Sequence, residues 1–398
     1  MLTPTDEAWR LVLKKLCSRT DFPKNLQRWH TPLALVNEML TKLAAVVNLQ
    51  GKNILTINME YVEILIYEFG IQPNKITFVI DCPQKAKIIK EHSRYKGVRV
   101  FECNYLSVEK IEDNNVKFDI ICGNPPYQTK SDESNRKTQP LWDEFVKKSF
   151  NLLKEDGYLC FVHPNGWRDV KGVFEDTKAL ILSKEVQYLE MHDMNDGVKT
   201  FDVQTNYDWY IAKNTPSKGN KTHIKGQDGS EYDVDISTLD FIPSRKFDEI
   251  FSLIAKPNED KVEILHSFSS YETRQDWMSE TKTDKFKYPC IYSIKMGDVP
   301  TLWYSSTNKK GHFGIPKFIW GNGVCTSIGS IVDADGEYGL TQFGYAIVDK
   351  KETLPHIKKA FDSPKFKELM KACPNQNNNI NRKVIALFRK DFWKQFIK

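Results

Sequence analysis

Short apolar runs alternate with polar, helix-compatible stretches between residues 53 and 162. The runs lie at residues 53–57, 76–80, 98–101, 118–122 and 157–162, and Ile and Val are frequent in them. Runs of about five such residues, separated by helical patterns, are typical of buried parallel strands joined by crossover helices. The pattern predicts an α/β domain with a doubly wound, Rossmann-like sheet, whose ligands bind beyond the carboxyl ends of the strands.

Helical periodicity flanks this region on both sides. Residues 1–50 read as helical, and Thr31 and Pro32 predict a cap followed by a first-turn proline. The apolar residues between 380 and 396 also recur at helical spacing and predict a terminal helix. We therefore expect helices at both ends of the chain.

The character of the chain changes near residue 215. Residues 213–220 have the composition of a linker or a hairpin tip, and later segments are irregular, rich in aromatic residues and lysine, and punctuated by glycines. A chain of 398 residues is long enough for two packed domains. We predict an α/β domain at 1–214 and a mixed α+β domain at 215–398.

Composition and charge narrow the protein class. No apolar run approaches the roughly 20 residues that cross a bilayer, and the N-terminus lacks a signal-peptide core. We therefore expect a cytoplasmic location and no membrane partner. Eight scattered cysteines without a C-x-x-C pair favour reduced core residues over a metal or disulfide framework. Residues after 215 carry 28 basic against 23 acidic side chains, which accounts for the whole net charge of +5. This distribution suits contact with a polyanion, although solvated surface lysines explain it equally well.

The most informative segment is the loop Asn124-Pro125-Pro126-Tyr127, which directly follows the apolar run 118–122. Two prolines fix the backbone and remove two amide donors, which leaves main-chain carbonyls free to accept hydrogen bonds. The Asn124 side-chain oxygen and the Pro125 carbonyl suit the two hydrogens of an exocyclic amine, and Tyr127 offers a ring for stacking. An amine buried in a duplex is unreachable, so such a site implies base flipping or a single-stranded target.

This segment resembles the catalytic motif of amino-methyltransferases, because a strand is followed by Gly-Asn-Pro-Pro-Tyr and then by a polar loop. Over residues 28–213 the chain resembles the gamma class of N6-adenine DNA methyltransferases, found in bacterial and phage restriction-modification systems. In that family the cofactor half comes first and the catalytic loop second, so the resemblance makes residues 215–398 a target-recognition domain.

The resemblance also implies the roles of individual residues. Asp81 follows the second strand, where the family holds the ribose hydroxyls of S-adenosylmethionine, and Asn104-Tyr105 stands where the family contacts the cofactor's adenine. The implied cofactor-binding residues are Thr31, Asn58, Glu60, Asp81, Cys82, Asn104 and Tyr105, with Gly123 and Trp167 beside the substrate. Asn124, Pro125, Pro126 and Tyr127 carry the catalytic role.

The chain departs from the family at the turn after the first strand, where a glycine-rich loop lets the backbone approach the cofactor's methionine moiety. Here the sequence reads Asn58-Met59-Glu60-Tyr61-Val62, and both glycines are replaced. Three explanations stay open. The loop holds S-adenosylmethionine in a shifted pose, with Glu60 or Glu63 on its amino group; it holds another donor; or the domain has lost catalysis and kept DNA binding.

Other candidates carry less weight. His163 is more often structural at such a position, and His192, Asp193 and Asp196 form a loop rather than a metal site, because no further ligand stands at the right spacing. In the second half, Trp320 lies among aromatic, basic and amide side chains that suit DNA contact or an aromatic-rich core equally.

The expected function is methyl transfer from S-adenosylmethionine to the N6 amine of a flipped adenine in double-stranded DNA. The resemblance implies a monomer in a bacterial cell or a phage-infected host, with a restriction endonuclease as a candidate partner. A DNA-binding pseudo-methyltransferase is the alternative from the non-enzyme class. A related transferase acting on RNA or protein amines is the third hypothesis.

Overall fold

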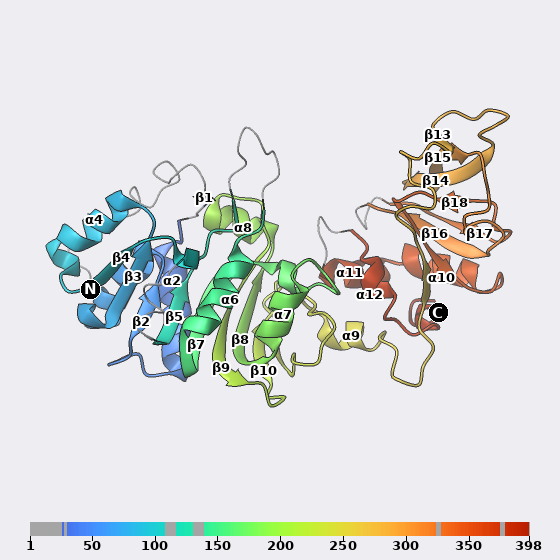
Figure 1. The fold of residues 1–398 in the computed structure, drawn as a ribbon. Coiled ribbons are helices and arrows are strands. Elements are labelled where there is room, and N and C mark those ends of the chain that lie inside the picture. The colour runs from blue at the N-terminus through green and yellow to red at the C-terminus, as the bar shows by residue number, and fades with distance from the viewer. Residues whose placement is uncertain are drawn as a thin grey trace. The chain divides into compact units, whose positions relative to one another are not determined.

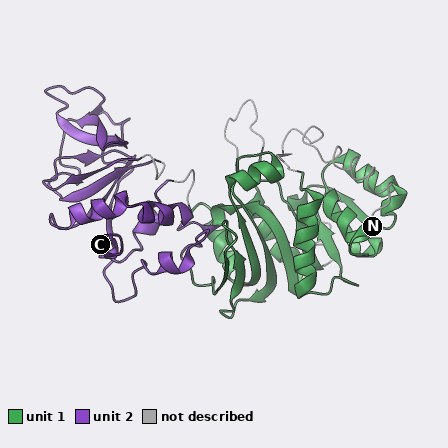
Figure 2. Ribbon diagram, turned by 180° about the vertical axis from the view of Figure 1, so that it is seen from behind, with its two compact units in different colours: residues 1–167, 172–239 green, residues 168–171, 240–398 purple. Residues whose placement is uncertain are grey.

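The computed structural model describes residues 26–27, 30–107, 117–129, 139–323, 328–374 and 379–397. The chain divides into two compact units, each described separately here (Figure 2). Unit 1 comprises residues 1–167 and 172–239, and unit 2 comprises residues 168–171 and 240–398.

The predicted domain boundary at 214/215 is therefore placed too early. Strand β9 (Tyr207–Pro216) runs through it, and β10 (Thr222–Lys225) then pairs in parallel with β8 (Lys184–His192). A further strand, β11 (Glu231–Val234), pairs with β10. The backbone ladder thus continues past the polar segment 213–220, because that segment is a connection within one sheet and not a linker between domains.

Unit 1 contains a nine-stranded mixed sheet in the order β11-β10-β8-β9-β7-β5-β2-β3-β4 (Figure 1). The strands not yet given are β2 (Ile54–Thr56), β3 (Ile76–Ile80), β4 (Arg99–Glu102), β5 (Phe118–Gly123) and β7 (Leu153–Pro164). A separate two-stranded pair joins β1 (Leu26–Gln27) to β6 (Gln128–Thr129). The predicted parallel strands at 53–162 are confirmed, and the sheet is the Rossmann-like sheet that the sequence predicts.

Helices cover both faces of this sheet. They are α2 (Leu33–Val46), α3 (Met59–Tyr67), α4 (Pro83–Glu91), α6 (Trp142–Leu152), α7 (Glu175–Leu182) and α8 (Met194–Phe201). Alternate strand residues pack with α2, α3 and α4 in one core, while α6 and α7 lie over the opposite face (Figure 1). Short 3-10 turns lie at Pro73–Lys75, Ser93–Tyr95, Tyr105–Ser107 and Asn165–Arg168.

The strand order reverses between β2 and β5. From β2 the chain winds outward through β3 to β4, and it then returns to β5 on the other side of β2. In open α/β sheets such a switch point leaves a crevice at the carboxyl ends of the two central strands, and ligands bind there. The turn after β2 and the Asn124-to-Tyr127 loop after β5 both begin at this crevice.

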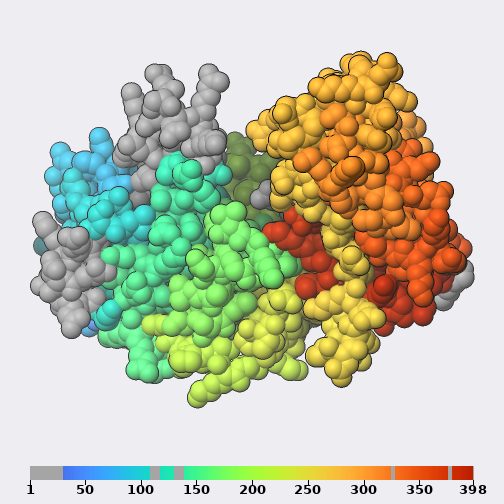
Figure 3. Space-filling model, turned by 45° about the vertical axis from the view of Figure 1, so that its right-hand side comes forward, coloured from blue at the N-terminus to red at the C-terminus, as the bar shows by residue number. Residues whose placement is uncertain are grey.

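Unit 2 is built on two four-stranded sheets, β12-β19-β16-β17 and β13-β15-β14-β18. The strands are β12 (Glu263–Leu265), β13 (Met278–Ser279), β14 (Tyr288–Lys295), β15 (Val299–Ser305), β16 (Lys317–Gly321), β17 (Ser330–Asp333), β18 (Gly339–Leu340) and β19 (Gly344–Val348). Its helices are α9 (Phe247–Phe251), α10 (Leu354–Asp362), α11 (Pro364–Ala372) and α12 (Arg382–Ile385). The gold-to-orange surface in Figure 3 includes strands of both sheets.

The end of the chain does not form the continuous helix predicted for 380–396. It consists of α12 and a 3-10 turn at Phe392–Gln395, and the apolar residues of both pack into the core of unit 2. The apolar residues between 380 and 396 thus recur at helical spacing because two separate turns are buried, not because they form one helix. The helix predicted after Pro32 is present as α2, whereas the helical prediction for residues 1–25 lies outside the described residues.

Six of the eight cysteines lie in the described part of the chain, and none of them forms a disulfide with another described cysteine. Cys17 and Cys325 lie outside it. Among the described helices, none combines the length and apolarity that a membrane crossing requires.

Candidate active site

The Gly123-to-Tyr127 segment leaves the carboxyl end of β5, the strand beside the switch point. Gly123 lies tightly against the turn after β2. A Cβ atom at this position would come within 2.8 Å of the Asn58 Oδ1 atom and 2.9 Å of the Ile57 Cγ1 atom. Glycine is therefore required here by close approach of the two loops, and the expectation that Gly123 borders the site stays a prediction.

Asn124 is held by three hydrogen bonds. Its backbone N–H donates to Asn58 Oδ1 (2.7 Å), its backbone carbonyl accepts from Asn58 Nδ2 (3.2 Å), and its own Nδ2 donates to Thr31 Oγ1 (3.2 Å). The side chain is 2% exposed. Its orientation is thereby set by the turn after β2 and by the residue that precedes α2.

The side-chain oxygen of Asn124, in contrast, is not hydrogen bonded to a described residue. Oδ1 is buried and has no hydrogen-bond partner among the described residues. Leaving a buried acceptor unsatisfied costs about 1–3 kcal/mol, so such an atom in a folded protein calls for an explanation. A ligand N–H group would satisfy this acceptor.

Tyr127 closes this loop on its aromatic side. Its ring is 5% exposed and meets the ring of Phe201 edge-on, with the centroids 6.3 Å apart. The hydroxyl is buried without a hydrogen-bond partner among the described residues, and burial raises the pKa of Tyr127 well above its usual value. The phenol therefore stays neutral throughout the physiological range.

Thr31 links Asn124 to Glu60, because its hydroxyl accepts from Asn124 and its backbone N–H donates to Glu60. The Glu60 carboxylate is 3% exposed and accepts the Thr31 backbone N–H (3.0 Å), and it also lies 2.9 Å from His30 Nδ1. Burial opposes ionisation of this carboxyl, but His30 and two backbone N–H groups outweigh it and lower the pKa of Glu60. The sequence predicts Thr31 as the N-cap of the following helix, and this prediction is wrong. Pro32 holds the cap position without a side-chain hydrogen bond.

The remaining predicted cofactor residues divide into two groups. Asp81, Cys82 and Asn104 follow β3 and β4, and so lie at the same carboxyl edge of the sheet as the crevice. Asn104 is exposed and its side chain accepts the Leu106 N–H. Tyr105, in contrast, is buried, donates to or accepts from Ser149 Oγ at 2.7 Å and stacks on Phe145, which places it in the layer between the sheet and α6.

Glu63, the second candidate for a ligand amine, is already satisfied. It is fully buried, pairs with the Arg94 guanidinium at 2.8 Å and accepts the Tyr95 hydroxyl at 3.0 Å. Its carboxylate therefore serves the packing of α3 against the segment after α4.

Three of the other sequence candidates lie in cores. His163 stacks on Trp142 at 4.2 Å, and burial lowers its pKa to about 4, so its imidazole is neutral. Trp167 is 1% exposed and donates its Nε1–H to Asp208. Trp320 is fully buried in the core of unit 2, which accords with the aromatic-core interpretation of that segment.

Sequence reasoning missed Phe201, whose ring contacts Tyr127, and Tyr207, whose ring contacts Phe201. Phe201, the last residue of α8, lies between Tyr127 and Tyr207, and its ring meets that of Tyr207 edge-on at 4.9 Å. A single phenylalanine at the end of a helix gives no specific signal in the sequence. Phe201 reaches the loop only because β9 returns beside β7.

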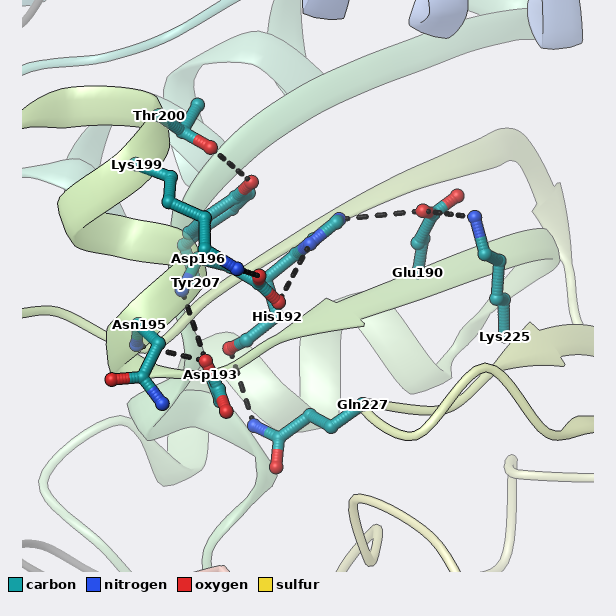
Figure 4. Close-up of polar contacts among 10 residues, drawn as sticks. All are labelled: Glu190, His192, Asp193, Asn195, Asp196, Lys199, Thr200, Tyr207, Lys225 and Gln227. Atoms are coloured by element: carbon teal, nitrogen blue, oxygen red, sulfur yellow. Dashed lines mark hydrogen bonds and ion pairs between the residues drawn. The ribbon is translucent and has the colours of Figure 1, made fainter.

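A polar cluster holds α8 in this place (Figure 4). Asp193 caps the helix by accepting the N–H groups of Asn195 and Asp196. His192 stacks on Tyr207 at 4.3 Å, and its ring nitrogens lie 3.4 Å from Glu190 and 3.6 Å from Asp196. These contacts join α8 to β8 and β9, and no group of three or more potential metal ligands occurs among the described residues.

Comparison with known proteins identifies the fold of unit 1. Residues 39–201 match the model of the Eco57I restriction-modification methylase family, and this range contains β2 to β8 and the Asn124 loop. Modification methylase CviBIII of Paramecium bursaria Chlorella virus NC1A is 32% identical over 114 residues, which are 27% of this chain and 29% of that protein. This chain therefore spans less than a third of that relative's length.

Two solved structures are also similar. The type IIG restriction endonuclease BpuSI has a TM-score of 0.50 at 8% identity, covering 98% of this chain and 63% of that one. A type I restriction-modification methyltransferase subunit from Streptococcus thermophilus has a TM-score of 0.41 at 15% identity, covering 57% and 53%. The resemblance that the sequence indicates is confirmed: over residues 39–201 this chain is similar to the Eco57I restriction-modification methylases, and unit 1 has a Rossmann-like fold.

Proposed function

We propose that this protein binds double-stranded DNA and holds the N6 amine of a flipped adenine in the Asn124-to-Tyr127 loop for methylation. The observation that carries the proposal is the buried Asn124 Oδ1 atom, which has no partner among the described residues while every other polar atom of that side chain and its peptide is held. The family matched by residues 39–201 supports a DNA methylase.

The chemistry of an exocyclic amine fits this loop. The amine carries two N–H groups, and Asn124 Oδ1 accepts one while the Pro125 carbonyl is our candidate for the other. Two acceptors on these hydrogens raise the electron density on nitrogen and direct its lone pair toward an electrophilic methyl group. Methyl transfer would form the N–C bond as the bond between the methyl carbon and its donor breaks, and the nitrogen would then lose one proton to solvent. Tyr127 is neutral and buried, so it is not the base that takes this proton.

The family's donor, S-adenosylmethionine, is only partly matched by this chain's residues. Asp81 follows β3 at the carboxyl edge of the sheet, where a ribose-binding carboxylate belongs. The turn after β2 does not fit the amino-acid end of the donor, because the side chains of Asn58 and Glu60 are buried there and bonded to Asn124, Thr31 and His30. For that reason we derive no transfer step through this donor.

Unit 2 is our candidate for DNA recognition. The excess of basic side chains lies after residue 215, and cationic side chains neutralise DNA phosphates. The acting form implied by the resemblance is a monomer, with a restriction endonuclease as a separate partner. The buried Glu60 favours one alternative, a DNA-binding relative that does not transfer a methyl group.

The test uses the full chain, adenine-containing duplex DNA and S-adenosylmethionine, followed by mass analysis of the nucleosides. We expect N6-methyladenine from the wild type and a loss of about 100-fold or more with Asn124→Ala, since removing one oriented polar group from an active site typically costs that much. Asn220→Ala, at an exposed loop residue, is the matched control and should leave the product unchanged.

Each result separates the candidates. DNA binding without methylated adenine at millimolar donor would overturn the enzyme and favour the pseudo-methyltransferase. Methylated cytosine, or a preference for RNA over duplex DNA in competition, would retain the transferase and overturn the adenine-DNA assignment.

A further inference from the structure

We propose that the Glu60 carboxylate fills the place that the amino-acid carboxylate of an S-adenosyl ligand would take at the switch point between β2 and β5. It would make this chain bind adenine nucleosides without an amino-acid carboxylate at least as tightly as S-adenosyl amino acids. The inference rests on the proposed function only in placing a nucleoside ligand at the switch point between β2 and β5. It assigns to Glu60 a specificity role that the family's glycine at this position does not have.

The contacts of Glu60 are those that a bound carboxylate would make. One carboxylate oxygen receives the Thr31 backbone N–H and lies within hydrogen-bonding distance of the His30 imidazole. Thr31 stands two residues before the first residue of α2, so its N–H lies near the positive end of that helix. Backbone N–H groups at such a place favour an anion.

The position of these contacts ties them to the crevice. Glu60 stands in the first turn of α3, only two residues separate β2 from that helix, and the preceding Asn58 is bonded to the catalytic loop. Thr31 joins the two sides, because its N–H serves Glu60 while its hydroxyl accepts from Asn124. Glu60 and Asn124 are therefore joined through a single residue.

Glu60 should outcompete a ligand carboxylate for the Thr31 N–H group, for two physical reasons. Glu60 belongs to the chain, so its effective concentration at the Thr31 N–H group far exceeds that of a free ligand. A ligand carboxylate would also lie beside a buried, ionised Glu60, whose pKa is already lowered by His30 and the N–H groups. Two like charges in a buried site repel each other, whereas a neutral thioether end brings no such charge.

The experiment is calorimetric titration of the full chain, without DNA, with two probes. S-adenosylhomocysteine carries the amino-acid carboxylate, and 5′-methylthioadenosine has the same nucleoside and sulfur without it. For the wild type we expect methylthioadenosine to bind as tightly as S-adenosylhomocysteine or more tightly. In Glu60→Gly we expect S-adenosylhomocysteine to gain about tenfold or more in affinity, a change of 1.4 kcal/mol, while methylthioadenosine changes less than about twofold.

Two further variants keep the result interpretable. Glu68→Gly places the same substitution at the exposed far end of α3 and should alter neither affinity. Glu60→Gln removes the charge and keeps the size, so it serves if Glu60→Gly unfolds, and it should favour S-adenosylhomocysteine by several-fold over wild type. The melting temperature of each variant reports whether it is folded.

Three outcomes would overturn the inference: a wild type that binds S-adenosylhomocysteine ten times more tightly than methylthioadenosine, a Glu60→Gly affinity equal to wild type, or no nucleoside binding by any folded variant. The first of these leaves the methyltransferase proposal standing. Conversely, gained affinity in Glu60→Gly without any methylated DNA would sustain the inference and sink the methyltransferase proposal.

Discussion

Asn58 and Asn124 are hydrogen bonded to each other in both directions. The Asn58 side-chain oxygen accepts the Asn124 N–H at 2.7 Å, and the Asn58 amide nitrogen donates to the Asn124 carbonyl at 3.2 Å. One side chain thus substitutes for a neighbouring strand beyond the end of the β2–β5 ladder, where Thr56 and Cys122 form the last backbone pair. The Asn124-to-Tyr127 loop is thus held by the turn after β2.

Asn58→Ala should therefore destabilise unit 1. The substitution leaves the buried Asn124 N–H without its acceptor, which costs about 1–3 kcal/mol. We expect the calorimetric melting temperature to fall by roughly 2–4 °C for each kcal/mol lost in a unit of this size. An unchanged melting temperature, relative to the exposed control Asn220→Ala, would show that the pair does not hold the loop.

Gly123→Ala should be destabilising because of close contact rather than backbone strain. The added methyl group would meet Asn58 Oδ1 at 2.8 Å and Ile57 Cγ1 at 2.9 Å. Such overpacking typically costs about 1–3 kcal/mol. The penalty should be smaller in an Asn58→Ala background, where one of the two clashing atoms is gone, and a double-mutant cycle measures that coupling. Gly321→Ala, whose nearest neighbour would be 3.4 Å away, is the control.

Asp193→Ala should loosen α8. The Asp193 side chain accepts two N–H groups at the helix start, and losing such a cap costs about 1 kcal/mol. Asp193→Asn retains the acceptor and should restore most of the stability. Because α8 ends at Phe201, hydrogen exchange of its amides should rise in the alanine variant only. Equal exchange in both variants would contradict the capping role.

Acid should destabilise the protein through Glu190. Burial alone would raise the pKa of Glu190, but the nearby His192 ring and the hydrogen bonds from Lys225 and Tyr188 outweigh it and lower the pKa to about 2, from an ordinary value of 4.5. Since the folded pKa is the lower one, this stabilisation is present above pH 4.5 and is lost as the pH falls toward 2.

The measurement compares wild type with Glu190→Gln in urea unfolding at pH 6 and pH 3. The wild type should lose more stability than the variant over this interval, by an amount on the order of 1–2 kcal/mol. Parallel pH dependence in the two proteins would show that Glu190 titrates normally.

Trp320→Phe should affect stability and not DNA binding. The indole is fully buried against Phe318, Phe361 and Tyr345, so the smaller ring leaves a cavity that costs roughly 1–3 kcal/mol. We expect the DNA dissociation constant at fixed salt to change less than about twofold. A tenfold weakening in a variant that remains folded would instead restore Trp320 as a substrate-binding residue.

Much of unit 1 was predictable from local pattern. Buried parallel strands appear in sequence as short Ile- and Val-rich runs, and β2, β3, β5 and β7 follow such runs because most of their residues are buried. The edge strand β4 also follows a run, but its Arg99 and Glu102 are exposed. The domain boundary was not predictable in this way. The two strands that continue the sheet of unit 1 past residue 214, β10 and β11, have only four residues each, with polar positions along them, and the parallel pairing of β10 with β8 joins residues more than thirty positions apart.

By itself, the sequence determined the Asn124-to-Tyr127 loop, its place after a buried strand and the absence of glycine from the turn after β2, since all three are local facts. Only the tertiary structure decided what those residues do to one another. Asn58, Glu60, Thr31 and Asn124 meet because parallel strands bring all their carboxyl ends to one edge, and Phe201 joins Tyr127 because β9 returns beside β7. Residue spacing along the chain carries no record of such contacts, whose free energy arises only when distant segments pack together.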